Sequence, residues 1–146
     1  MKRLVTLIVF ALMIVSISSS AKKFYADVQV TDINPTSKFT WERENKNTPK
    51  YPIELARSGI RGCAILSFDI SDSGKTENVE IINSIPNKSI GKYSRRMLKK
   101  WKWLPVSSED SFTVEKRTLR LDFCMGGEST ERSQKDCIQQ TKLACS

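Results

Sequence analysis

The fold of this chain is decided by residues 51–105, which read YPIELARSGIRGCAILSFDISDSGKTENVEIINSIPNKSIGKYSRRMLKKWKWLP. Pro52 suits the first turn of a helix and Gly59 suits the residue just past a helix end, so the segment opens with a predicted two-turn helix. From Gly62 onward apolar and polar residues alternate, which predicts a strand. Residues 72–74 provide turn chemistry before a second alternating run, and the two runs together predict a hairpin.

A second helix is predicted between Pro86 and Pro105. One side of this helix faces the core, and four basic residues fall on the opposite side. The core-facing series is Ile90, Ser94, Met97, Leu98 and Trp101, and the basic series is Arg95, Arg96, Lys99 and Lys100. Because Trp101 lies with the apolar series, we expect it to anchor the core rather than to stack on a ligand.

A third strand is predicted before Cys124, where apolar and polar residues alternate again. Leu119, Leu121 and Phe123 share one face, and Thr118, Arg120, Asp122 and Cys124 share the other. A helix of ~15 residues is ~22 Å long, about the length of a seven-residue strand, so it can carry the chain back across the sheet. We therefore expect an α+β domain with a three-stranded antiparallel sheet, in the order second-first-third, and two helices on one face.

This order of signals resembles the C-terminal domain of the TonB family, the periplasmic part of energy transducers that act on outer-membrane receptors. The matching residues need no insertion; they are Tyr51-Pro52, 59–62, 68–70, Gly74, Asn78-Val79, Ser84, Pro86 and 101–103 before Pro105. The resemblance implies a TonB C-terminal-like fold. It also implies a binding mode in which the last strand pairs with a short segment of an outer-membrane receptor.

The third strand borders solvent in the expected sheet order, so its backbone groups are free to accept an extended peptide as a fourth strand. The partner-binding positions that follow are Thr118, Leu119, Arg120, Leu121 and Asp122, with Tyr51 and Arg57 in the leading helix segment as a second contact. The alternative is that Arg120 and Asp122 only guard an edge against aggregation. An open edge can also pair with a second copy of the chain to form a homodimer.

The four cysteines, Cys63, Cys124, Cys137 and Cys145, predict disulfides in an exported chain and allow three connectivities. Cys63 begins the expected central strand and Cys124 ends its neighbour, so we expect these two to pair first. Cys137 then pairs with Cys145, and the C-terminal tail must bend between them because a straight helix would hold them ~12 Å apart. The chain has no histidine and no zinc-knuckle spacing, so neither a metal nor a cofactor is expected.

The N-terminal residues 1–21 have the layout of a secretory signal peptide, with two basic residues before an uncharged run over 4–17 and a Ser-rich stretch ending at Ala21. The uncharged run is shorter than the ~20 residues that span a bilayer. We therefore expect cleavage after Ala21 and a periplasmic location. An uncleaved anchor in the inner membrane, facing the periplasm, is the alternative.

The remaining chain divides by sequence into three parts, which are an N-terminal extension or linker over 22–50, the TonB-like domain over 51–124 and a Cys-containing tail over 125–146. The chain carries a formal net charge of +8. Cleavage after Ala21 would leave an excess of six positive charges, since the first 21 residues carry two basic and no acidic residues. In an exported protein anionic lipid or cell-wall polymer is a more plausible partner for this charge than nucleic acid, but a well-solvated basic surface without a specific ligand is favoured over all three.

No arrangement of a nucleophile with a base is found, since histidine is absent and the carboxylates are scattered, so the chain is not expected to be an enzyme. The leading hypothesis is a periplasmic TonB-like protein-binding module that engages an outer-membrane receptor or other envelope protein by strand addition, in support of TonB-dependent transport. Two alternatives stay open. One is a reduced, membrane-anchored energy transducer, and the other is a structural envelope protein that binds cell-wall polymer through its basic helix face.

Overall fold

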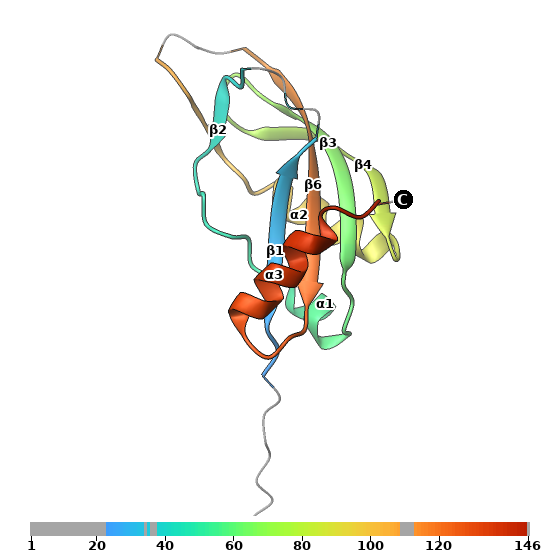
Figure 1. Cartoon of the computed structure of the whole chain (residues 1–146). Helices are drawn as coiled ribbons and strands as arrows, with labels where there is room; N and C mark the ends of the chain where they lie inside the picture. The colour runs from blue at the N-terminus through green and yellow to red at the C-terminus, as the bar shows by residue number, and fades with distance from the viewer. Residues whose placement is uncertain (1–22, 34, 36–37, 109–112, 146) are drawn as a thin grey trace, which may run out of the picture.

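The computed structural model of the chain describes residues 23–33, 35, 38–108 and 113–145, so the predicted signal peptide lies outside the described residues. The elements in chain order are β1 (Ala26–Asp32), β2 (Trp41–Arg43), α1 (Ile53–Arg57), β3 (Gly62–Ile70), β4 (Thr76–Ile85), α2 (Lys88–Leu98), β5 (Trp103–Pro105), β6 (Glu115–Met125) and α3 (Thr130–Gln140) (Figure 1). None of the helices in this described part is long and apolar enough to cross a membrane.

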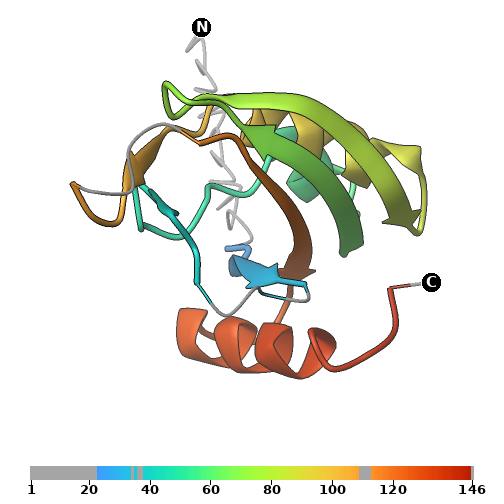
Figure 2. The same cartoon turned by 90° about the horizontal axis from the view of Figure 1, so that it is seen from above.

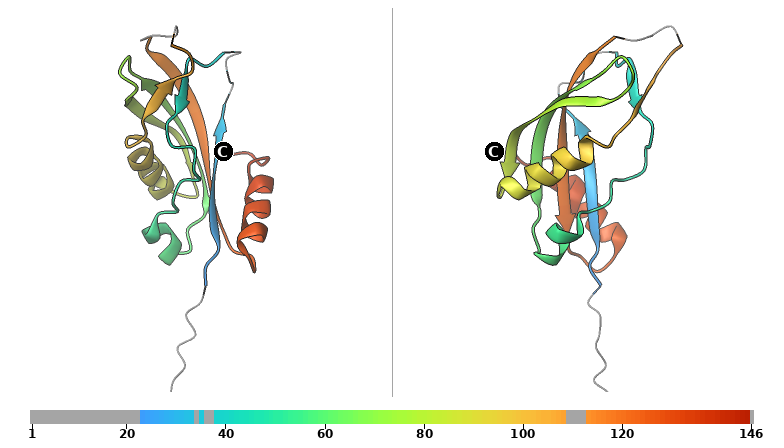
Figure 3. Two further views of the ribbon diagram at one scale, coloured as in Figure 1. Left: turned by 90° about the vertical axis from the view of Figure 1, so that its left-hand side faces the viewer. Right: turned by 180° about the vertical axis from the view of Figure 1, so that it is seen from behind.

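The main sheet has four antiparallel strands in the order β1-β6-β3-β4, and β2 pairs with β5 in a separate two-stranded sheet. Figure 3 shows three layers, with α1 and α2 on one face of the main sheet and α3 on the other. Seen from above in Figure 2, α3 lies across the side of β1 and β6, and the chain then turns toward the end of β3.

The predicted α+β class is confirmed, but the expected three-stranded sheet is wrong in its strand number. Strands β4, β3 and β6 do lie in the expected relative order. Beyond β6, however, β1 adds a fourth strand whose residues pair in register from Ala26 opposite Met125 to Asp32 opposite Leu119. Residues 22–50 therefore supply two strands, and α3 supplies a third helix on the face that was expected to be bare.

The hydrophobic core lies between the sheet and the helices α1 and α2. Alternation along β3 and β6 sends one set of side chains into this layer, as predicted from the period of two. The fully buried members include Leu55, Leu66, Phe68, Ile70, Ile90, Leu98, Leu119, Leu121 and Phe123. Gly91 allows α2 to approach β4 closely, because a Cβ atom there would lie only 2.8 Å from the Cγ2 atom of Ile81.

The second helix ends earlier than expected. It stops at Leu98 rather than continuing to Pro105, and Trp103–Pro105 forms strand β5 opposite Trp41–Arg43. The turn before β4 explains the change, because the backbone oxygen of Gly74 accepts a hydrogen bond from the Trp103 N–H at 2.9 Å. Gly74 has a φ of +72°, and a Cβ atom there would clash with the Trp103 oxygen at 2.3 Å.

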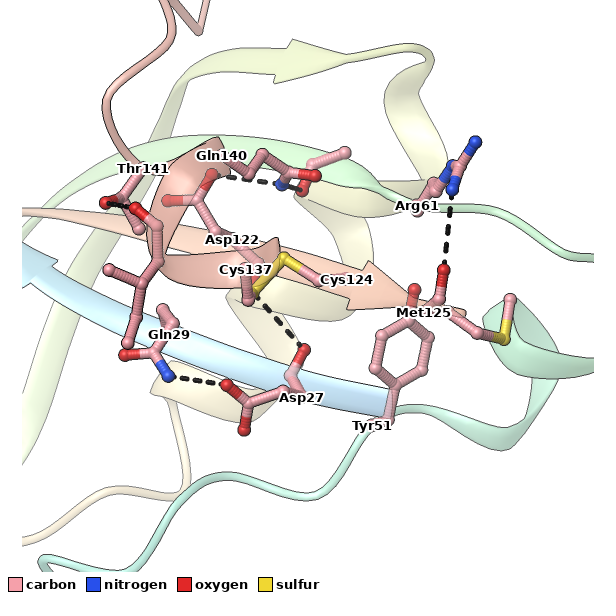
Figure 4. The surroundings of a disulfide bond; sticks show 12 residues. Asp27, Gln29, Tyr51, Arg61, Asp122, Cys124, Met125, Cys137, Gln140 and Thr141 are labelled. Carbon is pink, nitrogen blue, oxygen red and sulfur yellow. Dashed lines mark hydrogen bonds between the residues drawn. A yellow bond between two sulfur atoms is a disulfide. The ribbon is translucent and has the colours of Figure 1, made fainter. Parts of the chain in front are cut away.

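The predicted disulfide pairing, Cys63 with Cys124 and Cys137 with Cys145, is wrong. The structure joins Cys63 to Cys145, with 5.9 Å between their Cα atoms. It joins Cys124 to Cys137, with 5.2 Å between theirs (Figure 4). Cys63 lies opposite Asp122 in the β3–β6 register, so Cys124 sits two residues further along the neighbouring strand. The chain does bend between the two tail cysteines, where α3 ends at Gln140, but the bend carries Cys145 to β3.

Candidate protein-binding edge

The five positions predicted on the third strand, Thr118 to Asp122, lie in the interior of the sheet. Each residue of β6 in this stretch pairs with β3 on one side and with β1 on the other. Leu119 and Leu121 are buried in the core, and Asp122 is 0% exposed on the opposite face. The expectation of a free backbone edge at β6 is therefore wrong, because β1 already occupies that edge.

Arg120 and Asp122 form a buried ion pair that connects β6 to the end of α3. The Nε and Nη2 atoms of Arg120 donate to the two carboxylate oxygens of Asp122, each at 2.8 Å. The same guanidinium donates to the carbonyl oxygens of Leu143 and Gln140 at 2.6 and 3.1 Å. Gln140 donates in turn to the Asp122 carboxylate at 3.1 Å (Figure 4). The side chains of Arg120 and Asp122 therefore fix the C-terminal end of α3 rather than guard an open edge.

The edge strand on this side of the sheet is β1 rather than the expected β6. Ile33 donates its N–H to the Thr118 oxygen at 3.0 Å, and at the other end Gly126 donates to the Tyr25 oxygen at 2.9 Å. The register between these two bonds runs without a shift, so the odd-numbered residues of β1 bond to β6. In an antiparallel ladder the residues between them point their backbone groups the other way. The backbone groups of Ala26, Val28, Val30 and Asp32 therefore face outward, where no described strand pairs with β1.

The opposite edge, formed by β4, is much less regular. The β3–β4 register shifts twice, between Ile65 and Leu66 and between Ser67 and Asp69. Asn78 adopts a left-handed conformation with a φ of 50°. Such irregularities bend an edge and weaken its ability to pair with another strand. By contrast, the sequence of β1, ADVQVTD, contains neither a lysine nor a proline, and its pairing with β6 is unbroken.

The side chains of β1 divide between the two faces of the sheet. Val28 is 2% exposed and lies opposite Phe123 in the core layer. Asp27 and Gln29 lie on the α3 side, where the Gln29 amide donates to the Asp27 carboxylate at 2.5 Å (Figure 4). Burial raises the pKa of Asp32 at the end of the strand, and the nearby Arg117 opposes that rise. The strand is thus anchored by one apolar face, and no described strand pairs with its outer backbone edge.

The two weaker predicted contacts lie elsewhere. Tyr51 is half-buried before α1, where its hydroxyl donates to the Ile60 oxygen at 2.7 Å and its ring meets Phe123 edge-on with centroids 5.6 Å apart. Burial raises the pKa of Tyr51 to about 12, although Arg61 acts in the opposite direction. Arg57 is exposed in the last turn of α1. Neither residue belongs to the edge formed by β1.

Sequence reasoning missed β1 as the outer strand, although a signal for it was present. Val28 and Val30 alternate with Asp27, Gln29 and Thr31 over Ala26–Asp32, and this is the period of a half-buried strand. A start signal for α3 was also present, because Ser129 is the N-cap whose side chain accepts a hydrogen bond from the Arg132 N–H at 3.1 Å. Within the described residues, no group of histidine, cysteine and carboxylate side chains is arranged to hold a metal ion.

Comparison with known proteins finds a matching protein family. The family model for the C-terminal region of the Gram-negative bacterial TonB protein matches residues 47–123. Protein TonB of Yersinia enterocolitica is 26% identical over 70 residues, which are 48% of this chain and 28% of that protein. Protein TonB of Xanthomonas campestris pv. campestris (strain B100) is 33% identical over 60 residues, which are 41% of this chain and 27% of that protein. The match thus spans less than a third of the length of each relative.

A comparison with solved structures finds a partial similarity. The solution NMR structure of the Pseudomonas aeruginosa TonB C-terminal domain is 20% identical in sequence, with a TM-score of 0.47. The alignment covers 64% of this chain and 92% of that domain.

Proposed function

Because the chain belongs to the family of Gram-negative bacterial TonB C-terminal domains, as residues 51–105 predicted, we propose that it is a periplasmic, non-catalytic protein-binding module that supports TonB-dependent transport. Its partner is an outer-membrane receptor or another envelope protein. The observation that carries the proposal is the regular outer edge of β1, with which no strand of the described residues pairs, since such an edge accepts an extended segment as a further strand.

The ladder of the added strand forms on β1 rather than on β6. Pairing at β6 would require removal of β1, whose seven residues are in register with β6 and whose Val28 is buried in the core. Pairing at β1 leaves these contacts in place and uses backbone groups that already face outward. The outward-facing residues Val28 and Val30 then lie at the centre of the new ladder.

A proline at Val30 tests this placement directly. Proline has no N–H, so Val30→Pro removes one outward donor from β1 while leaving the hydrogen bonds of Gln29 and Thr31 to β6. Val30→Ala is the matched control, because it shortens the same side chain but keeps the N–H. Val30 is only partly buried, so both variants are expected to fold.

The measurement is capture of outer-membrane proteins by the immobilised, oxidised chain from an envelope extract, followed by mass spectrometry. We expect outer-membrane receptors to be enriched by the original chain and by Val30→Ala, and to be lost with Val30→Pro. Equal capture by the two variants would show that the partner does not pair with β1. If sedimentation shows instead that the original chain dimerises and Val30→Pro does not, a second copy is the occupant of the edge.

A further inference from the structure

A basic groove lies on the face of the molecule that carries α2, between this helix and residues 43–50. Its volume is about 830 Å³, and it continues past the end of α2 to Trp101 and Lys102. No residue of β1 lines it. The groove is therefore a separate surface from the outer edge of the sheet.

The floor of the groove is apolar and belongs to the fold. Tyr93, Met97 and Trp101 follow one another at a spacing of four residues, and all three are partly buried against the core. This placement agrees with the expected role of Trp101 as a core anchor. The side chains that remain accessible along this line offer contact to an apolar group of a ligand.

The wall opposite α2 is tied to the structure by backbone and side-chain hydrogen bonds. Pairing of β2 with β5 places Arg43 opposite Trp103, and Glu44 donates its N–H to the Lys102 oxygen at 2.9 Å. The guanidinium of Arg43 donates to the Asn47 oxygen at 2.9 Å. The first part of this wall is therefore hydrogen-bonded to the fold.

The charge of the groove is strongly one-sided. Five basic residues line it, namely Arg43, Lys50, Arg96, Lys100 and Lys102, against two acidic residues, Glu44 and Glu54. Lys50, Arg96 and Lys100 are exposed and form no ion pair with any described residue. Their charges are therefore not neutralised within the described part of the protein and attract an anionic partner.

The arrangement of the guanidinium groups distinguishes between anionic partners. The Arg43 guanidinium lies over the Trp101 ring, 4.4 Å from its centroid, and that of Arg96 lies over Tyr93 at 5.4 Å. A guanidinium therefore occupies one face of each ring, and the partly buried Met97 between them, rather than a bare ring face for a sugar, is the apolar contact left to a ligand. A guanidinium held on an aromatic ring keeps its N–H groups at the edge, in the geometry that pairs with carboxylates.

We propose that this groove binds an acidic, extended peptide segment of a partner protein, with carboxylates on the basic rim and an apolar side chain against Met97 on the floor. It forms a second contact beyond the outer edge of β1. Charge complementarity makes the interaction sensitive to salt, because the rim residues are exposed.

The test is fluorescence anisotropy with a short labelled peptide that contains Glu and Asp and a single Phe. The matched probe replaces each acid by its amide, and binding is measured at low ionic strength. The variant Arg96→Glu/Lys100→Glu reverses two rim charges. The control, Lys92→Glu/Arg95→Glu, reverses two exposed charges of the same helix that do not line the groove.

We expect the rim variant to weaken binding of the acidic peptide by about tenfold or more, since two attractive contacts become repulsive. The control variant and Val30→Pro should bind like the original chain, and the amide probe should bind to none of them. Equal weakening by the rim and control variants would show a diffuse charge effect and overturn the proposal. Retention on peptidoglycan sacculi that depends on Arg96 and Lys100, without binding of the peptide, would overturn it in favour of a cell-wall polymer.

Discussion

Arg120 connects β6 to the end of α3 through a single guanidinium group. It donates to both oxygens of Asp122 and to two backbone carbonyl oxygens, that of Gln140 at the end of α3 and that of Leu143 beyond the helix. A cation at this position also complements the negative end of the helix dipole. Burial of two charges is costly, and only such complete hydrogen bonding offsets the cost. The pair therefore specifies where the tail of the chain attaches.

Because of Tyr51, the stability of the domain is expected to decrease with rising pH in the alkaline range. Burial raises its pKa in the folded protein to about 12, compared with an ordinary value of 10.0. Between these two values the unfolded chain loses the phenolic proton while the folded chain keeps it. The unfolded state then binds fewer protons, so the free energy of unfolding decreases as the pH rises through this window.

The variant Tyr51→Phe is expected to remove this contribution. At neutral pH it should cost about 0.5–1.5 kcal/mol, because the hydrogen bond to the Ile60 oxygen is lost. Between about pH 10 and pH 12 its stability should decrease less steeply than that of the original chain. Urea denaturation of both proteins at several pH values in this range measures the two slopes. Parallel slopes would show that Tyr51 does not titrate differently in the folded state.

Helix α3 is attached to the sheet differently from α1 and α2. Its buried residues are Ser133 and Cys137, so it brings hardly any apolar surface to the interface. Two disulfides hold this part of the chain instead, one from Cys137 within the helix and one from Cys145 beyond its end. The attachment of α3 is therefore covalent and polar rather than hydrophobic.

The two disulfides are expected to contribute unequally to stability. Cys124–Cys137 spans 13 residues and Cys63–Cys145 spans 82. Loop-closure entropy predicts a loss of about 3 kcal/mol for the shorter loop and about 4.5 kcal/mol for the longer one. Urea denaturation of Cys124→Ser/Cys137→Ser and of Cys63→Ser/Cys145→Ser, without reductant, tests this order. A larger loss for the shorter loop would show that native contacts around Cys137 outweigh chain entropy.

The difference between hydrophobic attachment and covalent or polar attachment also explains which elements could be predicted from the sequence. The hairpin of β3 and β4, helix α2 and strand β6 carry strong apolar periods, and each was predicted. Helix α3 has no apolar stripe, so the hydrophobic period that reveals most helices is missing. Strand β1 has Val28 and Val30 as its main apolar signal, and its position depends on the edge of β6, which is far away in the sequence. The disulfide pairing could not be deduced without α3, because this helix is what brings Cys137 to β6.

Binding of a partner at a strand edge stays a prediction, and the free edge expected on the third strand was wrong in position. Reasoning from the sequence indicated that an exposed strand edge is the surface for a partner, and it placed this edge at 118–122. In the structure β1 pairs with these residues, so the edge strand is β1, one strand further out. The basic face of α2 was recognised in the sequence, but the groove was not, since its other wall comes from residues 43–50.

On the scale of the whole molecule, the sheet separates two regions that are stabilised by different interactions. On one face, α1 and α2 enclose the hydrophobic core, whereas on the other face α3 rests on a polar surface with disulfides. Strands β3 and β6 pair on both of their edges and belong to both regions. Regions with few apolar contacts open at lower free energy than the core does. The face with α3 should therefore open independently once its covalent links are broken.

Hydrogen exchange followed by mass spectrometry, with and without reductant, tests this separation. In the oxidised protein we expect the amides of β3 and β6 to exchange most slowly and those of β1 to exchange faster, since β1 has one free edge. After reduction, α3 should lose its protection first and β1 should become less protected, because α3 packs on β1. The amides of β3 should keep theirs, since the apolar core remains intact. Simultaneous loss of protection in α3 and β3 would show instead that the two faces unfold as one cooperative unit and that the disulfides hold the whole domain together.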